Sequence, residues 1–168
     1  MQHSSHDTAA YVTSNNPFYW FKRALFKYAV FKGRARRKEF WMFMLTTQLI
    51  ALCFYLCDRT FGSMWILNGT YSIATLLPTA AVLTRRLHDT DQSGWWVIGF
   101  YTVSFLFLSM CIALSMEIDN AGHIPSLFQW SFISILFIAF TLQIIIVVFA
   151  CQKGTTGDNR FGPNPLEP

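Results

Sequence analysis

The spacing of charged residues constrains this chain more than any other feature. Charge-free runs cover residues 40–57, 60–84, 92–116 and 120–152, and their lengths are 18, 25, 25 and 33 residues. A helix needs about 20 predominantly apolar residues to cross a hydrocarbon core of about 30 Å. Each run can therefore hold one membrane-spanning helix, and we predict spans at about 40–57, 65–83, 95–116 and 129–151.

The predicted fold class is an all-α membrane protein with four transmembrane helices. Only helices and closed barrels satisfy their backbone hydrogen bonds inside a bilayer, and these runs lack the alternation of barrel strands. Charged residues make up 13% of the chain, about half of the roughly 25% found in soluble domains. A hydrophobic content of 53% also excludes a disordered chain. We expect the four spans to form one bundle within residues 32–152.

The basic residues predict the orientation of these spans. The N-terminal segment, the second loop and the C-terminal tail together carry twelve of the 13 Lys and Arg, and the other two loops carry only Arg59. An excess of basic residues marks the cytoplasmic side. Both termini should therefore be cytoplasmic, with loops at about 58–63 and 117–123 outside. We expect no cleavable signal peptide, because residues 1–16 are mostly polar and the first long apolar run starts at Phe40.

Two segments precede the first span. Residues 1–16 are expected to form a flexible polar tail. Residues 17–31 begin with a proline, which favours a helix start, and are dense in aromatic and basic residues. We predict a helix that lies in the cytoplasmic membrane interface. The alternative is a short helix packed on the cytoplasmic ends of the bundle. At helical spacing, one side of this helix would carry Phe18, Phe21, Leu25 and Tyr28.

A dense basic cluster lies immediately before the first span. Residues 32–38 contain five basic side chains in seven positions, among them Arg34, Arg36 and Arg37. Each basic residue next to an anionic leaflet gains about 1 kcal/mol. The cluster is expected to set the topology, and it is also a candidate site for anionic lipid or for a protein partner. We expect no nucleic acid here, because the patch is small and tethered to the membrane.

The loop after the second span is the most concentrated set of charges in the chain. Residues 84–96 read TRRLHDTDQSGWW. Charge close to hydrocarbon is costly unless it is paired or hydrated, so the second helix is expected to continue through Arg85 and Arg86, with Asp89 or Asp91 pairing back. Trp95 and Trp96 would form an interfacial belt. The functional alternative makes Arg86, His88 and Asp89 a binding or acid–base cluster.

The C-terminal tail is rich in glycine and proline. Residues 153–168 read KGTTGDNRFGPNPLEP, a composition that predicts consecutive turns. Backbone N–H groups in such turns can cradle an anion. Asn159 and Arg160 are the candidate binding residues here, and Arg160 could instead pair with Asp89 or Asp91.

Three stretches together resemble a known family. They read FKGRARRKEFW at residues 31–41, RRLHDTDQSGWW at 85–96 and GTTGDNRFGPNP at 154–165. In this order and between apolar spans, they are similar to the bacterial inner-membrane family catalogued as domain of unknown function 805 (YhaH-like). The resemblance covers about residues 16–165. It implies a bacterial cytoplasmic membrane and about four helices, it supplies no activity, and it gives no role to Thr155 or Thr156.

The remaining chemistry argues against an enzyme or a proton-coupled transporter. The predicted spans contain no ionisable residue of the kind that lines a transport pathway. Gln48 and Gln143 are interpreted as interhelical hydrogen-bonding groups. No phosphate-binding loop, nucleophile elbow or zinc motif is present. We therefore predict no catalytic residue, no metal and no cofactor.

We expect a non-enzymatic membrane protein that acts through its basic and aromatic cytoplasmic face. Its partners would be the phospholipid bilayer, anionic lipids, and a membrane-protein partner or further copies of itself, in envelope maintenance. One alternative is an oligomeric channel or transporter for small solutes. Another is a lipid-modifying enzyme that uses His88 and Asp89.

Overall fold

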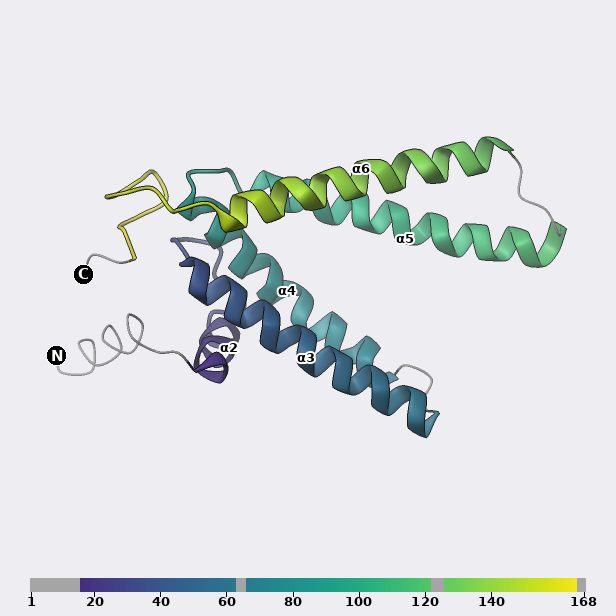
Figure 1. Cartoon of the computed structure of the whole chain (residues 1–168), viewed down its shortest axis with the longest axis horizontal. Coiled ribbons are helices and arrows are strands. Elements are labelled where there is room, and N and C mark those ends of the chain that lie inside the picture. Colours follow the sequence, from purple (N-terminus) through teal and green to yellow (C-terminus); the bar gives the residue numbers. More distant parts are fainter. Residues whose placement is uncertain (1–15, 63–65, 122–125, 166–168) are drawn as a thin grey trace. The chain divides into compact units, whose positions relative to one another are not determined.

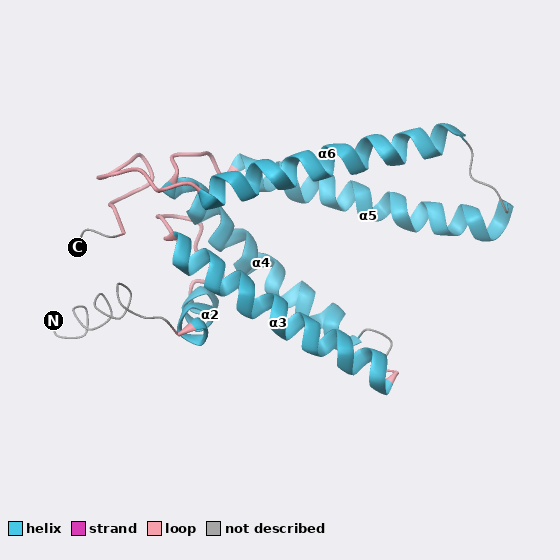
Figure 2. Ribbon diagram, in the orientation of Figure 1, coloured by secondary structure: helices cyan, strands magenta, loops and turns pink. Residues whose placement is uncertain are grey.

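The computed structural model describes residues 16–62, 66–121 and 126–165, and gives the backbone alone for 114–121 and 126–129. Within these ranges the chain forms helices joined by loops (Figures 1 and 2). This confirms the predicted all-α class. The helices are α2 (Pro17–Phe26), α3 (Arg37–Phe61), α4 (Ile66–Asp89), α5 (Trp95–Ala121) and α6 (Ser126–Cys151).

Four of these helices are long and apolar enough to cross a membrane. The qualifying segments within the described residues are Arg37–Phe61, Ile66–Asp89, Trp95–Ala113 and Trp130–Cys151. The number of spans therefore agrees with the prediction. Which side of the membrane the termini occupy stays a prediction.

The observed helices are longer than the charge-free runs. The loop predicted at about 58–63 is wrong in part, because α3 continues to Phe61 and Asp58 is buried within it. The Asp58 carboxylate accepts hydrogen bonds from the backbone N–H groups of Leu67 at 3.4 Å and Asn68 at 2.9 Å. These donors lie in the first turn of α4 and have no helical partner. Asp58 is therefore a buried residue of α3 whose carboxylate caps the N-terminus of α4. At the other predicted outer loop, α5 runs on to Ala121.

The described chain forms two compact units. The first contains Met1–Ser93 and Gln152–Pro168, and the second contains Gly94–Cys151. In the first unit α3 and α4 form a helical hairpin, and α2 packs beside α3 (Figure 1). In the second unit α5 and α6 form another hairpin. That all four spans form one bundle stays a prediction.

Helix α2 begins as the sequence predicts and ends earlier. Asn16 is its N-cap and accepts a 3.0 Å hydrogen bond from the Phe18 N–H, with Pro17 in the first turn. The helix ends at Phe26, and not at residue 31. The side chains of Trp20 and Ala24 are fully buried against the rest of the first unit, and Phe18 is exposed.

The second unit has almost no buried interior of its own. Large apolar side chains on both helices are exposed, as helices surrounded by lipid require, and Trp96 makes an edge-on contact with Phe149. Gln143 on α6 is exposed, and so is Gln48 on α3 in the first unit. Their expected role as hydrogen-bonding groups between helices is therefore not seen within either hairpin.

Candidate functional site

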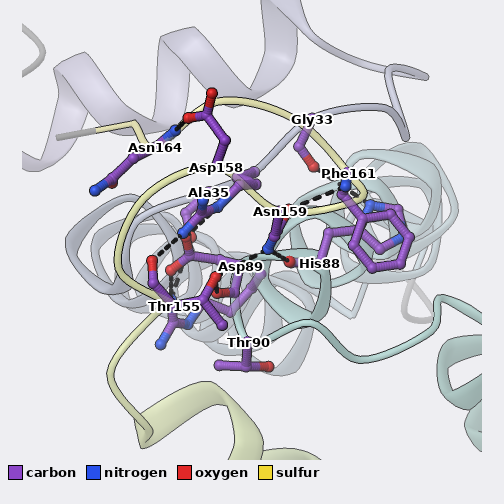
Figure 3. A network of polar contacts seen from close by, with 12 residues as sticks. Gly33, Ala35, His88, Asp89, Thr90, Thr155, Asp158, Asn159, Phe161 and Asn164 are labelled. Carbon is purple, nitrogen blue, oxygen red and sulfur yellow. Dashed lines mark hydrogen bonds and ion pairs between the residues drawn. The ribbon is translucent and has the colours of Figure 1, made fainter. Parts of the chain in front are cut away.

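Three segments that are distant in sequence meet at one end of the α3–α4 hairpin. They are the loop before α3, the last turn of α4 and the C-terminal tail (Figure 3). The Ala35 N–H donates to the Arg85 carbonyl at 2.9 Å, and the Thr155 N–H donates to the Asp89 carbonyl at 2.9 Å. These two backbone hydrogen bonds hold the three segments next to one another. They are the same three stretches that carry the family resemblance.

Asp89 lies at the centre of this junction. Its Oδ1 accepts a 2.9 Å hydrogen bond from Arg34 Nε, and its Oδ2 pairs with Arg86, one turn earlier on α4. All three side chains are buried. The second helix thus continues through Arg86 with Asp89 pairing back, as predicted. Two buried arginines therefore share this one carboxylate.

The same two arginines fasten the tail. Arg34 donates to the carbonyls of Thr155 at 2.6 Å and Gly157 at 2.7 Å. Arg86 donates to the Gln152 carbonyl and, at 3.3 Å, to the Ala35 carbonyl. Guanidinium groups carry five donors in a fixed planar fork, so each can bridge several segments at once. The arginines therefore hold the tail in place through its backbone carbonyls.

Gly154 allows the tail to approach this closely. A Cβ at this position would overlap the Asp89 carboxylate. Turns were expected from the glycines of the tail, and the structure adds a second reason for this one. Only a residue without a side chain fits between the tail backbone and Asp89.

Arg85 points to a different partner. It pairs with Glu39 of α3 at 3.2 Å, and both side chains are fully buried. The middles of α3 and α4 contain no charged residue, as predicted. The predicted spans leave out the Arg85–Glu39 pair, because both helices extend past their charge-free runs. Lys27 lies close to the pair. Burial lowers the pKa of the Lys27 amine, nearby Arg23 lowers this pKa further, and Glu39 opposes the shift.

His88 makes contacts of a structural kind. Its ring stacks on Phe161 at 3.8 Å between centroids, and its Nδ1 lies 3.3 Å from the Gly33 carbonyl. Asn159 donates from its side chain to the His88 carbonyl at 2.9 Å (Figure 3). Arg160 lies over the far part of this stack, with its guanidinium carbon 4.7 Å from the Phe161 ring centre. In the described residues, no three His, Cys, Asp or Glu side chains come together as metal ligands.

Arg160 does not join the buried network. It pairs with Asp91 at 3.1 Å, and both side chains are largely exposed. Of the two partners predicted for Arg160, Asp89 is therefore wrong and Asp91 is correct. Asp89 is unavailable because Arg34 and Arg86 already occupy both of its oxygens.

A cavity of about 470 Å³ opens beside Asp89. We call it the basic pocket, because among the described residues six basic side chains and a single carboxylate line it. Its walls come from the start of α3, the end of α4 and the tail. The lining residues are Arg34, Arg36, Arg37, Lys38, Arg86, Asp89, Lys153, Gly154, Thr155, Thr156, Asn164 and Pro165.

The structure brings together part of the predicted site. Arg34, Arg36, Arg37, Arg86 and Asp89 line the basic pocket. Arg85, His88, Asn159 and Arg160 support the surrounding structure and do not line it. Trp95 and Trp96 belong to the second unit.

Sequence reasoning missed several residues of the pocket. Lys38 and Lys153 line it, and Thr155 is fixed to Asp89 by its backbone. The position of Lys38 in the basic cluster, and of Lys153 directly after the last apolar run, could have indicated both lysines. Thr155 contacts Asp89 through its backbone N–H. Every residue except proline has this group, so the residue type could not have indicated the contact.

Comparisons with known proteins place this sequence in a family. The family described as "Protein of unknown function (DUF805)" matches residues 28–163, a range that includes the first two converging segments and the third as far as Pro163. The chain is 38% identical over 157 residues to inner membrane protein YhaH of Escherichia coli (strain K12), covering 89% of this chain and 98% of YhaH. It is 31% identical over 147 residues to inner membrane protein YhaI of the same strain, covering 87% and 94%. No solved structure matches the chain.

Proposed function

This chain belongs to the DUF805 family of proteins of unknown function, and from that premise we propose that it is a non-enzymatic inner-membrane protein that binds the headgroup of an anionic phospholipid at the cytoplasmic face. The basic pocket is the proposed binding site. The curated relatives YhaH and YhaI are inner membrane proteins, and four helices of this chain are suited to crossing a membrane.

The observation that carries the proposal is the charge of the pocket lining. Six basic side chains surround a cavity that contains one carboxylate. That carboxylate is already engaged by Arg34 and Arg86. Anions bound by Arg and Lys gain charge-assisted hydrogen bonds, which are about twice as strong as neutral ones. The volume of about 470 Å³ falls within the range of about 300–1,000 Å³ that is usual for small-molecule sites.

The position of the pocket along the helices favours a lipid over a soluble anion. Arg37 and Asp89 line the pocket, and they are the first residue of one candidate span and the last residue of another. The pocket therefore lies at the depth where a hydrocarbon core gives way to headgroups. The distribution of basic residues predicts that this end is cytoplasmic, and anionic lipids give that leaflet its negative surface potential.

Helix α2 supports contact with the same leaflet. One side of it packs on the first unit through Trp20 and Ala24, and Phe18 and Phe26 on other sides are exposed. Lys22 lies 5.7 Å from the Phe26 ring centre. Exposed aromatic rings beside basic groups are typical of helices at a membrane surface.

The arrangement of His88 favours binding over catalysis. The ring is held by Phe161 and the Gly33 carbonyl, and it does not line the basic pocket. A general acid or base must reach the proton that it transfers. A headgroup in the pocket would meet arginine, lysine and backbone groups in place of His88.

Lipid retention tests the proposal. The protein is reconstituted in nanodiscs that contain equal amounts of phosphatidylcholine and anionic lipid, and the lipids that remain bound are identified by native mass spectrometry. Wild-type protein should retain anionic lipid in preference to phosphatidylcholine. The double variant Arg37→Gln/Lys153→Gln, which changes two exposed pocket residues, should lose this preference.

Arg160→Gln is the matched control. It removes one positive charge at the same end of the first unit but outside the pocket, so it should retain the preference. Equal retention of both lipid classes by the wild type would contradict the proposal. A stoichiometric second protein bound in place of lipid would also contradict it.

A further inference from the structure

The charge balance of the basic pocket bears on which anionic headgroup it accepts. The lining carries five more positive than negative formal charges. A phosphate diester headgroup supplies one negative charge. A phosphate monoester supplies about 1.5 to 2 negative charges at pH 7 and three terminal oxygens that accept hydrogen bonds.

The inner wall of the pocket is built before any ligand arrives. Asp89 holds Arg34 and Arg86, and these arginines are fixed further by carbonyls of the tail. Neither guanidinium group can move away from the cavity without breaking these buried bonds. Side chains fixed in this way bind an anion without the cost of ordering them first.

The start of α3 adds positive potential. Arg36 is the N-cap of this 25-residue helix and makes no side-chain capping hydrogen bond, and residues Arg36, Arg37 and Lys38 line the pocket. The acidic residue of the first turn, Glu39, is buried against Arg85 and does not line the pocket. The helix dipole, which favours negative charge at an N-terminus, therefore acts on the cavity together with the three basic side chains.

From this balance we infer that the basic pocket selects a lipid whose headgroup is a phosphate monoester, such as phosphatidic acid, over diester lipids such as phosphatidylglycerol. The inference rests on the proposed function and specifies its ligand. The additional charge and the terminal oxygens of a monoester allow at least one more charge-assisted hydrogen bond. This corresponds to binding that is about tenfold tighter or more.

Acidification should remove the selectivity. The second pKa of a phosphate monoester is about 6, so its headgroup approaches one negative charge as the pH falls from 7.5 to 5.5. Within residues 16–62, 66–121 and 126–165, the charged groups that face the ligand are the six basic side chains of the pocket and Asp89, and none of the lining residues is a histidine. The loss of selectivity would then come from the ligand.

The experiment compares dissociation constants in nanodiscs of phosphatidylcholine that contain either phosphatidic acid or phosphatidylglycerol with matched acyl chains, at pH 7.5 and pH 5.5. We expect phosphatidic acid to bind about tenfold tighter at pH 7.5 and the two lipids to bind alike at pH 5.5. Arg37→Gln/Lys153→Gln should lose the difference, and Arg160→Gln should keep it. Because the lipid comparison itself uses the wild type, it stays informative if a variant fails to fold.

The outcomes separate this inference from the proposed function. Equal binding of both anionic lipids at pH 7.5, tighter than phosphatidylcholine, would overturn the monoester selectivity and leave the proposed function standing. Binding of neither anionic lipid would overturn the proposed function, and glycerol 3-phosphate is then titrated against the same protein. If glycerol 3-phosphate binds saturably and Arg37→Gln/Lys153→Gln abolishes this binding, the pocket is a monoester site for a soluble ligand. If glycerol 3-phosphate does not bind, the inference is overturned as well.

Discussion

The Tyr28 hydroxyl donates a 2.8 Å hydrogen bond to the backbone carbonyl of Ala74. Ala74 precedes Pro78 by four residues on α4, and proline has no N–H to donate to that carbonyl. A carbonyl that lacks its helical donor inside a membrane span is costly. Tyr28 therefore supplies the bond that Pro78 removes.

Tyr28→Phe should lower the free energy of unfolding by about 0.5–1.5 kcal/mol, the usual contribution of one hydrogen bond. The same change in a Pro78→Ala background should cost less, because residue 78 then donates its own N–H. Denaturation in mixed micelles, arranged as a double-mutant cycle, measures the difference. An equal cost in both backgrounds would contradict this account of the bond.

Asp89→Asn should destabilise the first unit by about 3–5 kcal/mol, because it leaves Arg34 and Arg86 buried without their shared carboxylate. Asp91→Asn is the matched control. Its partner is Arg160 in an exposed pair, for which about 0–1 kcal/mol is expected. Equal losses for the two variants in chemical denaturation would show that the buried network contributes little.

Gly154→Ala should displace the tail, because the new Cβ would overlap the Asp89 carboxylate. Overpacking of this kind costs about 1–3 kcal/mol. Limited proteolysis should then cleave the tail faster than in the wild type. Gly69→Ala on α4 is the control, since a Cβ there meets nothing within 4 Å, and it should leave the cleavage rate unchanged.

Trp20→Ala should weaken the attachment of α2, because its indole is fully buried against the rest of the first unit. Truncation of a buried tryptophan costs about 3–5 kcal/mol. Phe18→Ala removes an exposed ring from the same helix and should change the unfolding free energy little in detergent. Similar losses for both variants would indicate that α2 packs differently in solution.

The lowered pKa of Lys27 predicts that the free energy of unfolding depends on pH. Burial lowers its pKa in the folded protein, with Arg23 as a further cause, so the protonated amine favours the unfolded state. Stability should rise with pH through the alkaline range below 10.5, the ordinary pKa of the amine. Lys27→Met should reduce this rise. The comparison is the unfolding free energy of both proteins across that range, and identical slopes would contradict the prediction.

The helical class and the number of spans could be predicted because both depend on local composition. A charge-free run of about 20 residues has few alternatives to a membrane helix, since its backbone must bond internally. The ends of α3 and α4 could not be located in the same way. Glu39 and Asp89 lie outside the predicted spans and are nonetheless helical, because each pairs with a buried arginine.

The positions of the basic residues and of the three motifs that carry the family resemblance can be read directly from the amino-acid order. The folded chain is needed to see that Asp89 pairs with Arg34 and Arg86, whereas Asp91 pairs with Arg160. The fold also brings Lys38 and Lys153 to the same cavity. The physical reason is that hydropathy and charge act along the chain, whereas the pairing of buried charges depends on distances between segments up to 123 residues apart.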